Sequence, residues 1–187
     1  MLVSFNELEA RLKKAARGSG LPWGVAEEYA KSVLWLAHAG FELQGWAVDE
    51  LETSGIEQSL LDWAYALDLT EAPQQSSSTP LTASQAMLWL GFVGRYAKAK
   101  GVIVDLGRFT LYPTGVSSPE LPLMESLQII SEHKVNNSLN PSEPPRLRAE
   151  IEDDVWQRLG VLEFQTYAPD TEASRLKGAG AGLSDND

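Results

Sequence analysis

The sequence predicts an α+β fold: an N-terminal helical hairpin and further helices, followed by a small, mostly antiparallel sheet and a C-terminal helix. Apolar residues recur at helical spacing through residues 1–100, whereas residues 101–151 hold short β-branched runs separated by turn residues. Helices first and strands second are typical of α+β domains. We therefore expect one domain over residues 1–165, closed by a helix at 152–165, and a Gly-rich tail over 166–187.

The N-terminal hairpin is expected to consist of two short helices. Ser4 and Glu7 fit a capping box, in which each side chain binds a free backbone N–H group at the start of a helix. Gly18 is expected to end this helix, and a compact turn leads to a second helix over about 25–39. Its apolar stripe leaves Trp35 on the polar side. We expect another element of the same domain to cover this ring, and a pocket or a partner surface is the alternative.

Two further helices are expected after the hairpin. The first covers about 56–69, where apolar residues share one face. The second covers about 84–100 and starts at a capping box of Thr82 and Gln85. Its first half is apolar on all sides, which is typical of a buried helix and is also compatible with a buried strand. Residues 72–80 between the two have the composition of a linker.

Strands are expected in the second half of the chain. Short β-branched runs predict a hairpin of strands at 102–105 and 108–112 and a third strand at 126–130. A weak alternation predicts another at 146–151. Three acids at 152–154 then open the last helix, where the helix dipole favours negative charge, so we interpret them as N-terminal charge rather than as a metal site.

The composition excludes several classes of function. The chain has 15 Lys and Arg against 26 Asp and Glu, a formal net charge of −11. We expect no nucleic-acid binding, because that relies on cations that neutralise phosphates. Cys is absent, which excludes disulfides, thiolate metal sites and Cys nucleophiles. His38 is expected to suit the end of the second helix and His133 to be solvated, so we predict no metal and no cofactor.

The location of the protein is predicted from two absences. The opening residues lack the apolar run of a signal peptide. The most apolar stretch, residues 86–93, is much shorter than the roughly 20 residues that span a bilayer. We expect a soluble, cytoplasmic protein that does not bind membranes.

The candidate ligand-binding residues lie mainly toward the two ends of the chain. The turn at 18–20 fits an ordinary helix connection best, with an anion site as the alternative. In the tail, a Gly-rich backbone permits close approach to a ligand, and the neighbouring cations can bind a carboxylate or phosphate. The candidates are Trp23, Gly24, Glu28, Trp46, Glu172, Arg175 and Lys177.

Two sets of motifs resemble a known family. The segments SFNELEA, KAARGSG and WGVAEE, between residues 4 and 28, resemble the opening of a bacterial family of unknown function. The segments TYAP, TEASR and GAGAGLSDND, between 166 and 187, look like the end of the same family. The resemblance implies a bacterial origin and a stand-alone cytosolic protein, and it implies no reaction.

A second, fainter similarity links residues 3–46 to the N-terminal helices of the malate/lactate dehydrogenase family that is unrelated to the Rossmann enzymes. In that family a Ser-His-Gly follows the second helix and supplies the catalytic His. Residues 42–46 occupy that place here and contain no His. The sequence therefore does not predict this chemistry.

The prediction for function is an accessory or binding protein without a cofactor of its own, whose ligand is a small anionic metabolite or a protein partner. The alternative is a small cofactor-independent enzyme, a lyase or isomerase acting on an acidic metabolite, with Glu27, Glu28, Glu172 and Arg175 as the residues to test. A third hypothesis is a structural subunit that forms homo-oligomers.

Overall fold

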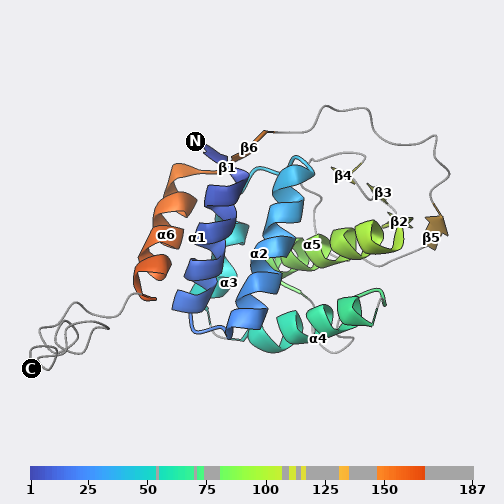
Figure 1. The fold of residues 1–187 in the computed structure, drawn as a ribbon, viewed down its shortest axis with the longest axis horizontal. Coiled ribbons are helices and arrows are strands. Elements are labelled where there is room, and N and C mark those ends of the chain that lie inside the picture. Colours follow the sequence, from blue (N-terminus) through green and yellow to red (C-terminus); the bar gives the residue numbers. More distant parts are fainter. Residues whose placement is uncertain are drawn as a thin grey trace, which may run out of the picture.

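The computed structural model describes residues 1–53, 55–69, 71–73, 81–106, 110–112, 115–116, 131–134 and 147–166. The strand expected at 126–130 and the tail from residue 167 onward lie outside these residues, as does most of the expected linker at 72–80. The described part begins with helices, continues through short antiparallel strands and ends with a helix (Figure 1). The α+β prediction is therefore confirmed.

The elements follow one another in the expected order, with a few additions. In chain order they are β1 (Leu2–Ser4), α1 (Phe5–Gly18), α2 (Trp23–His38), the 3₁₀ helix η1 (Gly45–Ala47), α3 (Asp49–Glu52), α4 (Glu57–Asp68), α5 (Ala83–Lys100), β2 (Val102–Asp105), β3 (Thr110–Tyr112), β4 (Gly115–Val116), β5 (Ser131–Lys134), β6 (Arg148–Glu150) and α6 (Asp153–Phe164). The short strand β1 was not expected, and β5 has a polar sequence that strand patterns do not identify.

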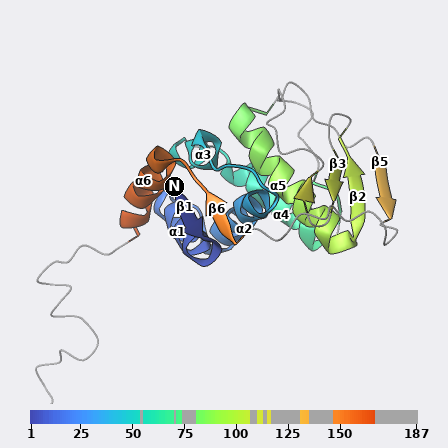
Figure 2. The same cartoon turned by 90° about the horizontal axis from the view of Figure 1, so that it is seen from above.

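The helices lie in a row that leads to the larger sheet. Figure 1 shows α6, α1 and α2 side by side, with α5 crossing beyond α2, and Figure 2 shows the strands β2, β3 and β5 on the far side of α5. Of the two predicted capping boxes, the one at α5 is complete, and at α1 the structure shows the Ser4 half. Ser4 Oγ accepts the Glu7 N–H at 3.2 Å, and Thr82 and Gln85 form the complete reciprocal box at the start of α5.

Two small antiparallel sheets join distant parts of the chain. In the first, β1 pairs with β6, and Val3 lies opposite Ala149. In the second, the strand order is β4-β3-β2-β5, with Val104 opposite Leu111. Leu43, in the loop after α2, makes a parallel bridge to Ile151. The beginning and the last helix of the described chain are therefore held together through β6.

The expected end of the first helix is confirmed, because Gly18 is the last residue of α1. The left-handed residue of the turn that follows is Gly20, whose φ is 104°. Gly18 is needed for packing, because a Cβ there would lie 1.7 Å from the Leu162 carbonyl oxygen of α6. The N–H groups of Ser19, Gly20 and Leu21 donate to carbonyls of α1. They cap that helix, which favours the ordinary-turn interpretation over the anion site.

Trp35 does not lie on an exposed polar face, because another element of the domain covers it, as expected. It is only 7% exposed and packs at the crossing of α2 and α5. A Cβ on Gly94 would lie 2.4 Å from the Trp35 ring, and a Cβ on Gly91 would lie 2.6 Å from the Ser32 carbonyl oxygen. Helix periodicity alone missed this burial because α5 covers what would otherwise be the outer side of α2.

One apolar cluster runs through the described residues, from Val3 of β1 to Leu162 of α6. Its largest fully buried side chains include Trp89 and Phe92 of α5 and Tyr29 of α2. Trp63 of α4 and Trp89 of α5 are 2% and 1% exposed, so both are packing residues. α5 is buried along most of its length, as its apolar sequence indicated, and it is a helix rather than a strand.

The helix crossing can be tested with Gly94→Ala. We expect this change to lower the free energy of unfolding by about 1–3 kcal/mol, because the added methyl group overlaps the buried Trp35 ring. The matched control is Gly160→Ala in α6, whose nearest neighbouring atom lies 3.8 Å away. That change should raise the free energy by about 0.5–1 kcal/mol, the usual gain for Ala over Gly inside a helix. Urea denaturation measures both, and a stabilised Gly94→Ala protein would contradict the crossing.

Candidate functional site

Trp23 and Gly24, two of the predicted site residues, form the first turn of α2. The N-cap is Pro22, and no side chain caps the helix. Trp23 is 58% exposed, and the Arg17 guanidinium lies 5.2 Å from the centre of its ring. Gly24 has no atom within 4 Å of the position of an added Cβ. This surface therefore presents an aromatic ring and a cation beside open space.

Glu28, one turn further along α2, is held in an ion pair between helices. Arg95 of α5 donates from Nη2 to Glu28 Oε2 at 2.5 Å and from Nη1 to the Glu28 carbonyl at 3.1 Å. The same Nη1 lies 3.1 Å from Oγ of Ser32, which is fully buried. Lys31 donates to the other Glu28 carboxylate oxygen at 2.7 Å. The four side chains clamp α2 to α5.

The charge state of Glu28 follows from these contacts. Burial by itself raises the pKa of the Glu28 carboxyl, but hydrogen bonds and charge attraction from Lys31 and Arg95 together outweigh it. The result is a pKa below the ordinary value of 4.5. Glu28 is therefore an ionised, fully engaged carboxylate, whereas a general base at neutral pH needs a raised pKa.

Trp46, the third described candidate, lies in η1 and is 7% exposed. Its indole Nε1–H is buried and has no hydrogen-bond partner. Among the side chains that the structure describes, no other buried nitrogen or oxygen atom lacks a partner. Trp89 offers a contrast, because its Nε1–H donates to the Pro73 carbonyl at 3.0 Å. Trp46 is thus a core residue with one unsatisfied donor, which is a destabilising arrangement.

A polar cluster connects α3 with the N-terminus of α5. Glu50 is 8% exposed and accepts from Thr82 Oγ1 at 2.8 Å and Gln85 Nε2 at 3.0 Å. Beside it, the Tyr29 hydroxyl donates to the Ala47 carbonyl. Burial, with added repulsion from the neighbouring acids of α3, raises the pKa of Tyr29 far above its usual range. Its hydroxyl therefore stays protonated and structural.

Arg158 of α6 binds the outer side of the same cluster. Its Nη2 lies 2.7 Å from Asp49 Oδ1 and 2.6 Å from Glu52 Oε2, and its Nε lies 3.1 Å from Glu52 Oε1. This two-pronged contact matches the fork geometry of the guanidinium. The third acid near Arg158 is Asp154, with Oδ2 3.8 Å from Nη1. The acids of α3 therefore position α6.

His38 has a structural role, and the acids at 152–154 lie at the N-terminus of α6. His38 Nδ1 lies 2.8 Å from the Leu34 carbonyl, and its ring stacks on Phe5 at 3.7 Å between centroids. The backbone of His133 lies in β5, opposite Ile103. Across the described ranges, no group of three or more acids or histidines is placed to hold a metal ion.

The predicted site residues have separate surroundings. Trp23 is a surface residue, Glu28 is part of a clamp between helices, and Trp46 belongs to the core. Glu172, Arg175 and Lys177 lie outside the described residues. Whether these side chains share one ligand site remains a prediction.

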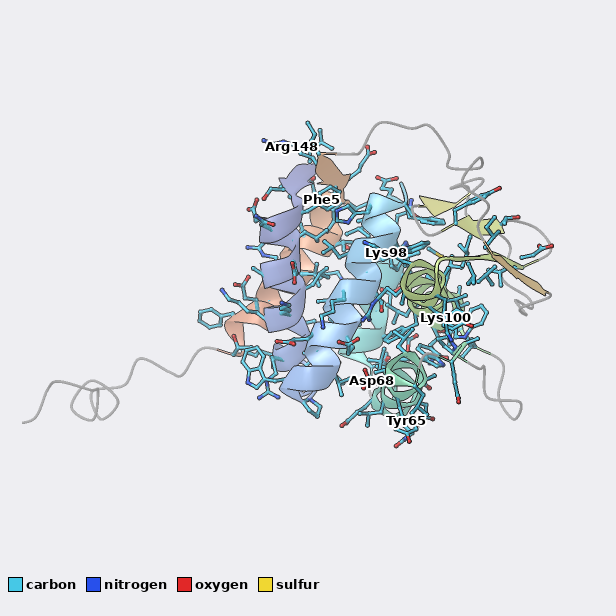
Figure 3. The ribbon with its side chains drawn as sticks, turned by 45° about the vertical axis from the view of Figure 1, so that its right-hand side comes forward. Phe5, Tyr65, Asp68, Lys98, Lys100 and Arg148 are labelled. Carbon is cyan, nitrogen blue, oxygen red and sulfur yellow. The ribbon has the colours of Figure 1, made fainter. Side chains whose placement is uncertain are left out.

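A row of exposed apolar residues on α4 and its C-cap was not predicted from the sequence. Leu61, Tyr65 and Leu69 are 40%, 64% and 48% exposed and follow each other at four-residue spacing. They lie on the side of the helix opposite to the buried Leu60 and Trp63. In Figure 3, Tyr65 lies on the side of α4 that faces away from α5. We call these three residues the α4 ridge. The four-residue spacing of the ridge is visible in the sequence once the buried side of the helix is known.

Comparison with known proteins identifies one family model that matches part of the chain. The family model described as "Protein of unknown function (DUF3726)" matches residues 3–53. The matched region contains the α1–α2 hairpin, η1 and α3, and the expected resemblance to a family of unknown function is confirmed there. Among curated proteins and solved structures, none matches this chain. In the part of the chain that the structure describes, no helix combines the length and apolar character needed to cross a membrane.

The unsatisfied donor of Trp46 gives a first test of this region. We expect both Trp46→Phe and Trp89→Phe to lower the free energy of unfolding. The loss should be about 1–2 kcal/mol smaller for Trp46→Phe than for Trp89→Phe. Both changes remove similar buried volume, but only the second breaks a hydrogen bond and leaves a carbonyl unpaired. Urea denaturation followed by far-ultraviolet circular dichroism measures both variants. Equal losses, or a larger loss for Trp46→Phe, would show that the indole N–H has a partner in solution.

The clamp at Glu28 gives a second test, by pH. A carboxyl whose pKa is lowered in the folded state stabilises the fold above its unfolded pKa, and that stability is lost as the pH falls through the folded pKa. The wild-type protein should therefore lose stability more steeply than Glu28→Gln below the ordinary value of 4.5. Acid titration of the urea midpoint measures this difference. The control Glu27→Gln removes an exposed neighbouring carboxylate and should keep the wild-type slope. Parallel curves for all three proteins would contradict the clamp.

Proposed function

We propose that this protein is an accessory protein that binds another protein through the α4 ridge, without a cofactor of its own. The observation that carries the proposal is the ridge itself. Single exposed apolar side chains are ordinary on protein surfaces, but three in one row form a continuous apolar contact line. Large exposed side chains such as Tyr65 are also the type that contributes most at protein interfaces.

The charged groups of the described core support a binding role over catalysis. Arg95 and Glu28 hold α2 to α5, and Arg158 holds α6 to α3. Glu163 of α6 accepts from Arg11 Nε at 3.1 Å and Lys14 Nζ at 2.9 Å, which joins α6 to α1. These groups are occupied in maintaining the fold. The alternative, a carboxylate-dependent lyase or isomerase, gains no support from Glu28, since its lowered pKa makes it a weak base.

Other parts of the sequence prediction stay proposals beside this one. A small anionic ligand at Trp23 and Gly24, with Arg175 and Lys177 from the tail, is compatible with the open surface at the start of α2. A bacterial, cytoplasmic setting rests on the family resemblance. The alternative for the α4 ridge is that it binds a second copy of this chain and forms a homo-oligomer.

The proposal is tested by affinity capture with the full chain as bait. Leu61→Ala with Tyr65→Ala removes most of the ridge while keeping good helix formers in α4. We expect a protein retained by the wild-type bait to be lost with this double variant, because the apolar contact that holds it is gone. Quantitative mass spectrometry of the retained proteins measures the loss.

The matched control is Val161→Ala, which removes a side chain of α6 that is 64% exposed. This variant should retain the same partner as the wild-type bait. The proposal fails if the double variant, shown to be folded by circular dichroism, captures the same proteins as the wild type. It also fails if Val161→Ala loses the partner to the same degree.

A further inference from the structure

We infer that the occupant of the α4 ridge is an amphipathic helix of another protein that carries Lys or Arg beside its own apolar row. The inference rests on the proposed function and adds the chemistry of the partner. Two observations carry it: the charge of the surface around the ridge and the geometry of the ridge.

The stretch of sequence that carries the ridge is acidic. Residues 39–94 contain eight Asp and Glu and no Lys, Arg or His. On α4 itself, Glu57, Asp62 and Asp68 are exposed, and none of them has a cationic partner within the described ranges. Asp62 accepts only the amide of Gln58, at 2.8 Å. Three unneutralised carboxylates beside an apolar row favour a partner with cations in matching positions.

The geometry of the ridge favours a helix. Residues at four-residue spacing form the ridges that interdigitate when two helices pack. The ridge from Leu61 to Leu69 is about 12 Å long at the usual rise per residue, so two to three turns of a partner helix would cover it. Helices bound in this way present apolar residues at three- and four-residue spacing.

Charge also argues against the other occupants. A second copy that packs its own α4 on this face would bring two sets of three carboxylates together. The exposed cations at the end of α5, Lys98 and Lys100, have only Ala99 between them and offer no apolar row to a second copy (Figure 3). Anionic lipid and nucleic acid would be repelled by the same carboxylates.

The test uses the full chain and two designed peptides. Each has about 18 residues, enough to be helical in water, with Leu at every fourth position. One carries Lys at the flanking positions and Ala elsewhere, and in its pair every Lys is Glu. We expect the Lys peptide to bind at least about tenfold more tightly than the Glu peptide at low salt, with the preference shrinking as salt is added. Fluorescence anisotropy of labelled peptides measures both affinities.

Two variants locate the contact and test the charge. Tyr65→Ala should weaken binding of the Lys peptide about tenfold, whereas Val161→Ala should leave it unchanged. Asp62→Lys combined with Asp68→Lys should reverse the preference toward the Glu peptide. Light scattering and flotation with vesicles of anionic phospholipid are run on the same samples.

The outcomes separate the inference from the proposed function. Equal binding of both peptides, lost in Tyr65→Ala, would overturn the basic partner but keep the docking face. A dimer that Tyr65→Ala dissociates, or vesicle binding that Tyr65→Ala abolishes, would overturn the inference in favour of a second copy or a membrane. Binding of neither peptide, or binding that Tyr65→Ala does not change, would overturn the inference, while capture of a partner dependent on the ridge would still uphold the proposed function.

Discussion

The close crossing of α2 and α5 is the constraint on which the rest of the structure depends. Two glycines of α5, Gly91 and Gly94, let its backbone lie against Ser32 and under the ring of Trp35. No other residue type provides the same clearance, because a Cβ at either position would overlap α2. The C-terminal half of α5 then supports β2 and β3, and its N-terminal end meets the acids of α3. A shift of this crossing would displace both the sheet and the polar cluster.

The charged contacts at the crossing fix its register more than they add stability. Arg95 is the cation of an otherwise apolar stretch of α5, and Glu28 and Ser32 lie opposite it on α2. Both charged groups lose hydration when they are partly buried, so the net gain from the pair is small. Sliding α5 by one turn would leave Arg95 without these acceptors. The glycines thus permit the close approach of α2 and α5, and the Arg95–Glu28 ion pair fixes how far α5 is shifted along α2.

Local signals in the sequence predicted the helices well and their packing poorly. Capping residues and apolar spacing placed the starts of α1 and α5 within one or two residues, because caps act over a single turn. The packing partners of Gly18 and Trp35 could not be predicted in this way. These residues contact Leu162 and Gly94, which are distant in sequence, and no local pattern encodes such contacts.

The candidate site was less predictable than the fold. A tryptophan in irregular chain, such as Trp46, reads equally well as a pocket residue or as core, and only packing decides between them. The ion pair of Arg95 could have been predicted from the sequence, because a cation within a buried helix needs a partner. The α4 ridge could also have been recognised in the sequence, because apolar residues repeat at four-residue spacing on the polar side of the helix. Its exposure could be judged only once the neighbours of α4 were placed.

The joining of the early and late parts of the chain has a consequence for how the protein is made. Leu2 pairs with Glu150, and Arg11 contacts Glu163, so the hairpin within the family-matched region completes its packing late. Contacts of such long sequence separation slow folding, because the loop between them must close first. At about 5–20 residues per second, α6 is synthesised roughly 7–30 seconds after α1. During that interval α2 can already pack on α1, but the part of α1 that contacts α6 is exposed to solvent.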